Sequence, residues 1–314
     1  MNHFGTEVRR GLARRSTRVL LAIAVLGVAC IGIGVFVSHE STFDPVAARA
    51  KAAVAFQQSV QQCIDNDAYG EAGPVTGDEL RRTCESFKGS PNDLVEDERF
   101  RLTTLWKAGD SNGGGLLSNT AFFLLIGALI GGATFIGAEW RFGTFGTLLT
   151  WDPRRLRVFF AKVAAAAAIT LVVGVVLQAL VALAVMPSAL WRGTTDGVDA
   201  EWLTDATAAV VRISFAGVIA ALVGFAIASI GRNTAAALGA AFAWFAVGEG
   251  LIRGLKPEWQ PWLAGENLSV LVTGKVPSEA SFDRTLPESS AILTVYLAVI
   301  LVAAAVVFLR RDVT

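Results

Sequence analysis

Long apolar stretches recur six times along the 314-residue chain, and each contains few charged residues. They are about 20 residues long, the length that a helix needs to cross a hydrocarbon core about 30 Å thick. Backbone groups find no water in lipid, and no stretch alternates like a barrel strand, so each is predicted to be helical. The pattern predicts an all-α integral membrane protein with six transmembrane helices. We place them at 19–37, 120–138, 160–185, 210–230, 235–254 and 291–309.

Composition supports this class of protein. Hydrophobic residues make up 53% of the chain and charged residues 17%, whereas about a quarter of a soluble domain is charged. The net charge is zero, so the total says nothing about nucleic-acid or acidic partners. From the apolar stretches we expect the lipid bilayer as surroundings and no nucleic-acid partner. The first stretch follows an arginine-rich run, which leaves a signal peptide as the alternative. We favour an uncleaved span, because the stretch is longer than a usual signal core and no A-x-A cleavage site follows it near Ser38.

The distribution of charge predicts the orientation in the membrane. On the side that carries both termini, 13 basic residues stand against four acids, and acids dominate the opposite side. Short basic loops stay in the cytoplasm, so both termini are predicted to be cytoplasmic, in a bacterial plasma membrane. The cytoplasmic segments are then 1–18, 139–159, 231–234 and 310–314, and the outer segments are 38–119, 186–209 and 255–290.

The N-terminus has the pattern of a short helix. Phe4, Val8 and Leu12 are four residues apart on one helical face, and arginines occupy other positions of 3–15. This spacing predicts a basic amphipathic helix that lies on the inner leaflet. A disordered basic tail is the alternative.

The first outer segment is predicted to hold a small helical domain. Residues 45–65 are rich in helix formers, and a turn with Gly and Pro separates them from a second helical stretch at 77–87. Cys63 and Cys84 lie on the oxidising side, where a disulfide can join the two helices; two free thiols are the alternative. In the last outer segment, the apolar run 268–272 is too short to span, so it enters the outer leaflet as a re-entrant hairpin or rests at the interface.

The segment between the second and third spans is predicted to dock on a partner. It runs from Glu139 to Lys162 with the sequence EWRFGTFGTLLTWDPRRLRVFFAK. Gly143 and Gly146 interrupt the second span's helix, and Pro153 begins a new helix that continues into the third span. An apolar face between them consists of Phe145, Leu148, Leu149 and Trp151. Such a face favours contact with another protein; a basic hairpin at the membrane interface is the alternative.

The order of residues in this segment resembles a loop of the ABC-2-type ABC transporter permeases. The matching residues are Glu139, Gly143, Thr144, Leu148, Leu149, Pro153, Arg155 and Lys162. Six spans, an N-terminal amphipathic helix and an outer hairpin before the last span are similar to the same family. The resemblance implies that residues 143–151 form a coupling helix in a groove of a cytoplasmic ABC ATPase, flanked by Glu139 and Arg155.

The resemblance also implies the composition of the complex. Two copies of the ATPase would work with two permeases, the second identical or homologous to this chain, as an exporter. ATP and Mg would be bound by the ATPase, and this chain would need no cofactor. The chain lacks the G-x-x-x-x-G-K-[ST] motif that holds phosphates, so we predict that it is not itself an ATPase.

One acidic and one basic residue in the fifth span form a further candidate site. Glu249 and Arg253 are spaced i,i+4 on one helix, where opposite charges can neutralise each other. The pair is either a polar contact on the transport path or permease dimer interface, or an ion pair near the outer surface that anchors the helix.

Two other function classes remain as alternatives. One is a signalling or assembly partner without transport, and the other is a membrane-embedded enzyme. The enzyme is less favoured, because His3 and His39 lie outside the spans and neither H-E-x-x-H nor G-x-S-x-G occurs. We predict no metal site. A neighbouring reading frame that encodes an ATPase would favour the transporter.

Overall fold

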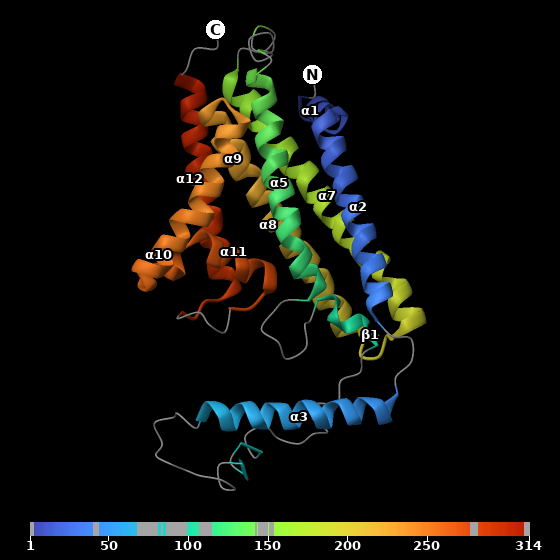
Figure 1. The fold of residues 1–314 in the computed structure, drawn as a ribbon. Helices are drawn as coiled ribbons and strands as arrows, with labels where there is room; N and C mark the ends of the chain where they lie inside the picture. Colours follow the sequence, from blue (N-terminus) through green and yellow to red (C-terminus); the bar gives the residue numbers. More distant parts are fainter. Residues whose placement is uncertain are drawn as a thin grey trace.

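Long helices that run up and down form a bundle in the computed structural model (Figure 1). The structure describes residues 3–39, 44–67, 81–82, 84–85, 99–106, 115–141, 143, 150, 154–276 and 282–310. Among these residues, six helices are long and apolar enough to cross a membrane, which confirms the predicted fold class. They are α2 (Arg15–Ser38), α5 (Leu116–Arg141), α7 (Arg155–Arg192), α8 (Ala200–Gly231), the continuous helix Thr234–Leu255, and α12 (Leu286–Arg310).

The two ends of the bundle differ in what they carry. The short helix α1 (His3–Ala13) lies at the same end as the last residues of α12, and we name this the α1 end (Figure 1). The helix α3 (Pro45–Asp67) lies across the opposite end, the α3 end (Figure 1). Each span is longer than the apolar stretch that predicts it. The fourth begins at Ala200, because the carboxylate of Asp199 caps the helix by accepting from the Trp202 N–H at 2.7 Å.

The central helix is α8. Most of its apolar stretch is buried, whereas in each of the other spans a third of that stretch or less is buried. It crosses α5 closely at two glycines: Gly132 of α5 faces the Ala221 backbone, and Gly224 of α8 faces the Leu129 backbone. A methyl group at either glycine would collide with a carbonyl oxygen. Small residues at such crossings let membrane helices pack backbone to backbone.

This crossing gives a direct test of the packing. Gly132→Ala is expected to destabilise the bundle by about 1–3 kcal/mol, because overpacking moves a backbone and not a flexible side chain. Gly131→Ala is the control at the neighbouring residue. A methyl group at Gly131 would have no atom within 4 Å, and alanine stabilises a helix by up to about 1 kcal/mol relative to glycine. The measurement is the temperature at which the detergent-solubilised variants lose their monodisperse chromatographic peak. Equal temperatures for the two variants would contradict the close crossing.

Two apolar clusters fill the bundle. One lies toward the α3 end and includes Leu117, Ile213 and Leu271. The other lies toward the α1 end and centres on Phe159, whose ring centroid is 5.6 Å from those of both Phe225 and Phe308. Aromatic rings in edge or tilted contact add to the stability of burial itself. The second cluster supports the charged residues described below, because Phe159 lies one helical turn before Lys162.

The fifth span is not a uniform α-helix. It consists of α9 (Thr234–Phe242), the π-helical segment η3 (Ala243–Gly248) and α10 (Glu249–Leu255). Short π-segments within α-helices occur frequently at functional sites. Here the segment ends directly before Glu249.

The predicted hairpin before the last span consists of η4 (Pro257–Trp262) and α11 (Ala264–Thr273). The Tyr296 hydroxyl donates to the Trp262 carbonyl at 2.9 Å. Tyr296 lies about 15 Å along α12 from its first residue, at 1.5 Å per residue. The end of η4 therefore lies beside the interior of α12. Entry of this hairpin into the outer leaflet stays a prediction. Its apolar run is buried in protein: Val270, Leu271 and Val272 are all nearly inaccessible.

The segment before α5 is attached to the bundle at the α3 end. Strand β1 (Phe100–Arg101) pairs in parallel with β2 (Gly193–Thr194), which directly follows α7, and the single turn η2 (Leu102–Leu105) comes next. Within the predicted second helical stretch, the described residues 81–82 and 84–85 are helical. Cys63 of α3 and Cys84 form a disulfide with their Cα atoms 5.9 Å apart, which is the pairing expected from the sequence.

Candidate functional site

Four charged side chains from separate parts of the chain meet inside the α1 end of the bundle. Lys162 of α7 lies at the centre and has no exposed surface. Glu7 of α1 and Glu139 of α5 are also buried, and Arg14, between α1 and α2, completes the group. We name these four residues the charged cluster.

Ion pairs at hydrogen-bond distance join the whole charged cluster. The Lys162 Nζ lies 2.8 Å from Oε2 of Glu7, and 2.9 and 2.8 Å from the two carboxylate oxygens of Glu139. The Arg14 guanidinium donates to Oε1 of Glu139 at 2.6 Å. It also donates to the carbonyls of Thr134 and Phe135 near the end of α5. These carbonyls lie about two turns before the last residue of α5, so Arg14 ties the beginning of α2 to α5 both there and through Glu139.

The sequence of α1 explains how a charged helix packs against the bundle. Glu7 and Gly11 share one face and are buried, whereas Phe4 and Leu12 are more than 40% exposed. A methyl group at Gly11 would lie 2.6 Å from the Phe135 ring, so only glycine lets α1 approach this closely. The predicted helix is present, but its inner face carries the acid, and two of the three apolar residues that identified it point outward.

The charged cluster is balanced, since two carboxylates meet two cations. Burying a charge without a partner costs several kcal/mol, so such groups occur inside membrane proteins as pairs or networks. The Lys162 ammonium has three protons, and carboxylate oxygens of two different helices accept from it. The arrangement therefore holds α1, α5 and α7 in one fixed relation.

The charged cluster joins the two ends of the segment that was predicted to dock on a partner. Glu139 and Lys162 are the first and last residues of that segment, and the structure brings them into direct contact. Gly143 has φ +64°, the left-handed conformation that ends helices, in agreement with its predicted role as a helix breaker. Arg155 begins α7 and donates to the Leu309 carbonyl of α12 at 3.3 Å. The remaining predicted coupling residues lie outside the described residues: Thr144, Phe145, Leu148, Leu149, Trp151 and Pro153.

Sequence reasoning did not find Glu7 and Arg14 as members of this site. One signal was available: Glu7 is the single acid in a basic N-terminal helix. Lys162 at the start of a membrane span also requires counter-charges. Neither signal identifies which of several acids approaches Lys162.

A second polar site lies toward the α3 end and joins the fifth span to the hairpin. Glu249 is buried, and both its carboxylate oxygens accept from the Gly265 N–H, at 3.0 and 3.1 Å. Gly265 lies in the first turn of α11, so the carboxylate caps this helix from another element. A methyl group at Gly265 would collide with the carboxylate. We name this contact the outer clasp.

The predicted partner of Glu249 has a smaller part in the outer clasp. Arg253 lies 3.8 Å from Glu249, but its Nε donates to Glu266 at 2.7 Å. Both residues of the predicted pair therefore connect α10 to α11. The charged cluster and the outer clasp lie at opposite ends of the bundle and share no residue.

The comparisons with known proteins agree with this architecture. The sequence model of the family described as "ABC-2 family transporter protein" matches residues 1–268, which is most of the chain. The match includes α1, the charged cluster, the outer clasp and all spans except the last. The comparison with curated proteins finds no match. The chain thus belongs to the ABC-2 transporter family, as a multi-pass membrane subunit that is distinct from the ATPase.

Proposed function

We propose that this subunit forms the translocation path of an ATP-driven exporter and receives force through the segment between α5 and α7. Two copies of a separate ABC ATPase would bind and hydrolyse ATP with Mg. A second permease, identical or homologous, would complete the path. The docking element is the coupling helix of residues 143–151, with the apolar side chains of Phe145, Leu148, Leu149 and Trp151 toward the ATPase.

The observation that carries the proposal is the contact between Glu139 and Lys162. These residues bound the docking segment, and their side chains meet at 2.8 Å inside the bundle. A push on the segment therefore reaches the ends of α5 and α7 together. The same ion-pair network includes Glu7, so α1 moves with them. Rigid groups of helices that move as one body are a common form of coupling between distant sites.

In the proposed mechanism, the charged cluster and the ends of α1, α5 and α7 move together as one rigid base. Closure of the ATPase dimer displaces residues 143–151, and the charged cluster transmits the displacement to three helices. The central α8 contacts α5 backbone to backbone at Gly132 and Gly224, so it follows α5. The α3 end then opens. Each ligand, ATP on the ATPase and substrate on the path, favours one of two positions of this base, which is the condition for coupling between sites.

The charge distribution supports the orientation that this mechanism needs. Exposed arginines gather at the α1 end, among them Arg9, Arg15, Arg18, Arg141 and Arg310. Basic segments near span ends favour the cytoplasmic side. We therefore assign the α1 end to the cytoplasm of a bacterial cell and the disulfide at the α3 end to the outside.

Substitution of the apolar face tests the docking step. The double variant Leu148→Asp and Leu149→Asp is expected to lose the ATPase that co-purifies with the wild-type subunit from native membranes. A carboxylate placed in an apolar groove loses its hydration without gaining a partner. The measurement is the ratio of ATPase to permease after affinity purification of the permease, with the ATPase identified by mass spectrometry.

The matched control is Val54→Asp, a similar change at an exposed position of α3 at the opposite end. It is expected to leave the ratio unchanged. Equal recovery of the ATPase with the double variant would overturn the assignment of residues 143–151 as the docking element.

A further inference from the structure

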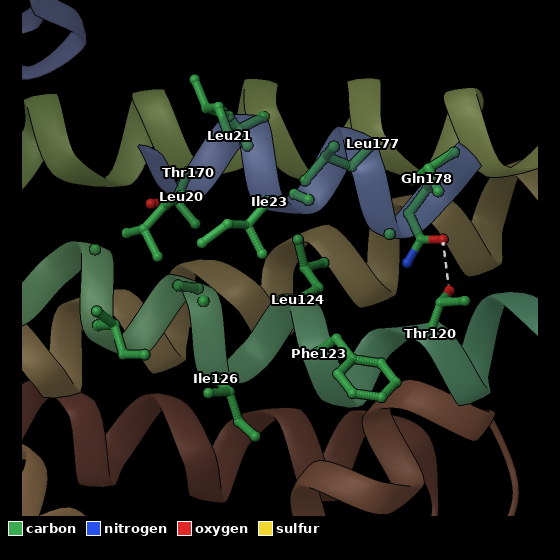
Figure 2. A pocket seen from close by; sticks show the side chains of 18 of the residues that line it. Leu20, Leu21, Ile23, Thr120, Phe123, Leu124, Ile126, Thr170, Leu177 and Gln178 are labelled. Atoms are coloured by element: carbon green, nitrogen blue, oxygen red, sulfur yellow. Dashed lines mark hydrogen bonds between the residues drawn. The ribbon is translucent and has the colours of Figure 1, made fainter. Parts of the chain in front are cut away.

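A lateral groove of about 650 Å³ lies between α2 and α5, with α7 as its floor. Figure 2 shows Leu20, Leu21 and Ile23 of α2 and Leu124 of α5 around this space. The volume lies within the range of about 300–1,000 Å³ that is usual for small-molecule sites. The groove is separate from both the charged cluster and the outer clasp.

Missing side chains create the groove. Gly27 of α2 and Gly127 and Gly131 of α5 line it, and a methyl group at any of the three would have no atom within 4 Å. Elsewhere α2 packs tightly, since a methyl group at Gly32 would lie 2.7 Å from the Ala184 carbonyl of α7. The helix α2 is thus fixed on α7, and its spacing from α5 stays open.

The lining fits an apolar chain and not water. Most of its residues are aliphatic or aromatic, with Thr170 as a polar residue between the two ends, and an apolar cavity does not hold water. From Thr17 to Ile31, the groove follows α2 for about 21 Å at 1.5 Å per residue, longer than one leaflet of about 15 Å. Toward the α3 end, the Thr120 hydroxyl meets the buried Gln178 amide at 3.5 Å (Figure 2). This polar pair marks the far limit of an apolar tail.

The opposite limit of the groove offers positive charge. Thr17 is the lining residue of α2 nearest the α1 end. Arg15 and Arg18 stand on either side of it along the chain and are exposed. The helix α2 begins at Arg15, and no side chain caps it. Free N–H groups at a helix N-terminus bind phosphate, and arginines near the membrane surface attract anionic lipids.

These three observations converge on one ligand. We propose that the groove binds one acyl chain of an anionic phospholipid from the leaflet at the α1 end. The phosphate lies at the beginning of α2 beside Arg15 and Arg18, and the chain enters between α2 and α5 at Thr17. The lipid fills the space that the three glycines leave and holds α2 apart from α5.

Photo-crosslinking tests the proposal in the intact protein. The full chain is reconstituted with phosphatidylglycerol that carries a diazirine on one acyl chain, irradiated, and mapped by peptide mass spectrometry. Labels are expected on groove residues such as Ile23 and Leu124. Gly27→Leu is expected to reduce groove labelling severalfold, because its side chain occupies the space. Gly34→Leu is the matched control on the same helix: that glycine is equally open but does not line the groove.

A comparison of two lipids with different headgroups tests the role of the positive charge. Phosphatidylglycerol is expected to label the groove on the order of 30-fold more than phosphatidylcholine with the same chains, because both nearby arginines favour an anionic lipid. The double variant Arg15→Gln and Arg18→Gln is expected to lose this preference. The exposed arginines Arg141 and Arg310, changed together to Gln, serve as the control.

Two results would overturn the proposal. One is labelling spread evenly over all lipid-facing helices and unchanged by Gly27→Leu. The other is equal labelling by the two lipids in the wild type. If Gly27→Leu fails to fold, competition in the wild type replaces it. Unlabelled phosphatidylglycerol must then displace the groove label at a lower mole fraction than phosphatidylcholine, and equal displacement rejects the proposal.

Discussion

Lys162→Met is expected to destabilise the folded bundle by about 3–5 kcal/mol, because it removes the buried cation that contacts both carboxylates. Glu139 then keeps Arg14, and Glu7 keeps only the half-exposed Arg10 at 3.5 Å. Lys162 contacts both Glu7 and Glu139 at 2.8 Å and is fully buried. The measurement is thermal stability in detergent. Lys256→Met is the matched control, since the Lys256 side chain is 64% exposed and its ion pair with Glu258 is 3.7 Å long. A surface pair of this kind contributes about 0–1 kcal/mol.

A second variant separates stability from coupling. In Lys162→Met combined with Glu7→Gln, the remaining ion pair joins Arg14 to Glu139 at 2.6 Å, so no charge is stranded. Most of the lost stability is expected to return, because removing both members of a buried pair costs little. The bridge from α1 to α7 stays broken. We therefore expect that the rate of ATP hydrolysis by the ATPase, which the wild-type permease changes on assembly, is not changed in the same way by the double variant.

The two readouts agree if the charged cluster is only a structural anchor, and they differ if it transmits force. In that case, the double variant would recover stability and wild-type ATP hydrolysis together. Recovery of both would contradict the transmission of force through Lys162. Recovery of stability alone supports it.

The six spans follow from the sequence because the requirement behind them is local. A chain in lipid must place about 20 apolar residues in a helix, and each predicted stretch lies within one helix of the structure. The π-helical turn at Ala243–Gly248 has no comparable local signal. Its sequence is as apolar as the helices around it, and the change in hydrogen bonding depends on packing that periodicity does not record.

The candidate sites show the same difference between local patterns, which the sequence reveals, and contacts between distant helices, which it does not. Glu139 and Lys162 were found because a contiguous motif contains both, but the contact of Lys162 with Glu7 spans 155 residues. For Glu249, the i,i+4 rule identified Arg253, whereas the closer partner is a backbone N–H in another helix. A residue pattern predicts neighbours on one helix and does not predict which helix lies opposite. The docking face of residues 144–149 and 151–153 lies outside the described residues and stays a prediction.

Glu249→Ala is expected to release α11 from the fifth span. The Gly265 N–H loses its acceptor, and an unsatisfied buried N–H costs about 1–3 kcal/mol. Glu249→Gln is expected to have a smaller effect, since an amide oxygen still accepts one hydrogen bond. Arg253→Gln is milder again, because Arg253 is 45% exposed and the carboxylate keeps the Gly265 contact. The measurement is hydrogen–deuterium exchange of the peptide 263–274, which is expected to quicken in this order of severity.

A double-mutant cycle gives the sharpest form of this test. Gly265→Ala alone is expected to disrupt the outer clasp, because its methyl group collides with the Glu249 carboxylate. In the Glu249→Ala background, the collision is gone, so the same change is expected to have almost no further effect. Residues in direct contact show such non-additive effects, whereas separate sites add. Gly250→Ala, at an open position beside Glu249, is the control and should add in both backgrounds. The π-helical segment η3 ends directly before Glu249. Strict additivity of Gly265→Ala with Glu249→Ala would therefore mean that movement of the fifth span does not reach the hairpin through this carboxylate.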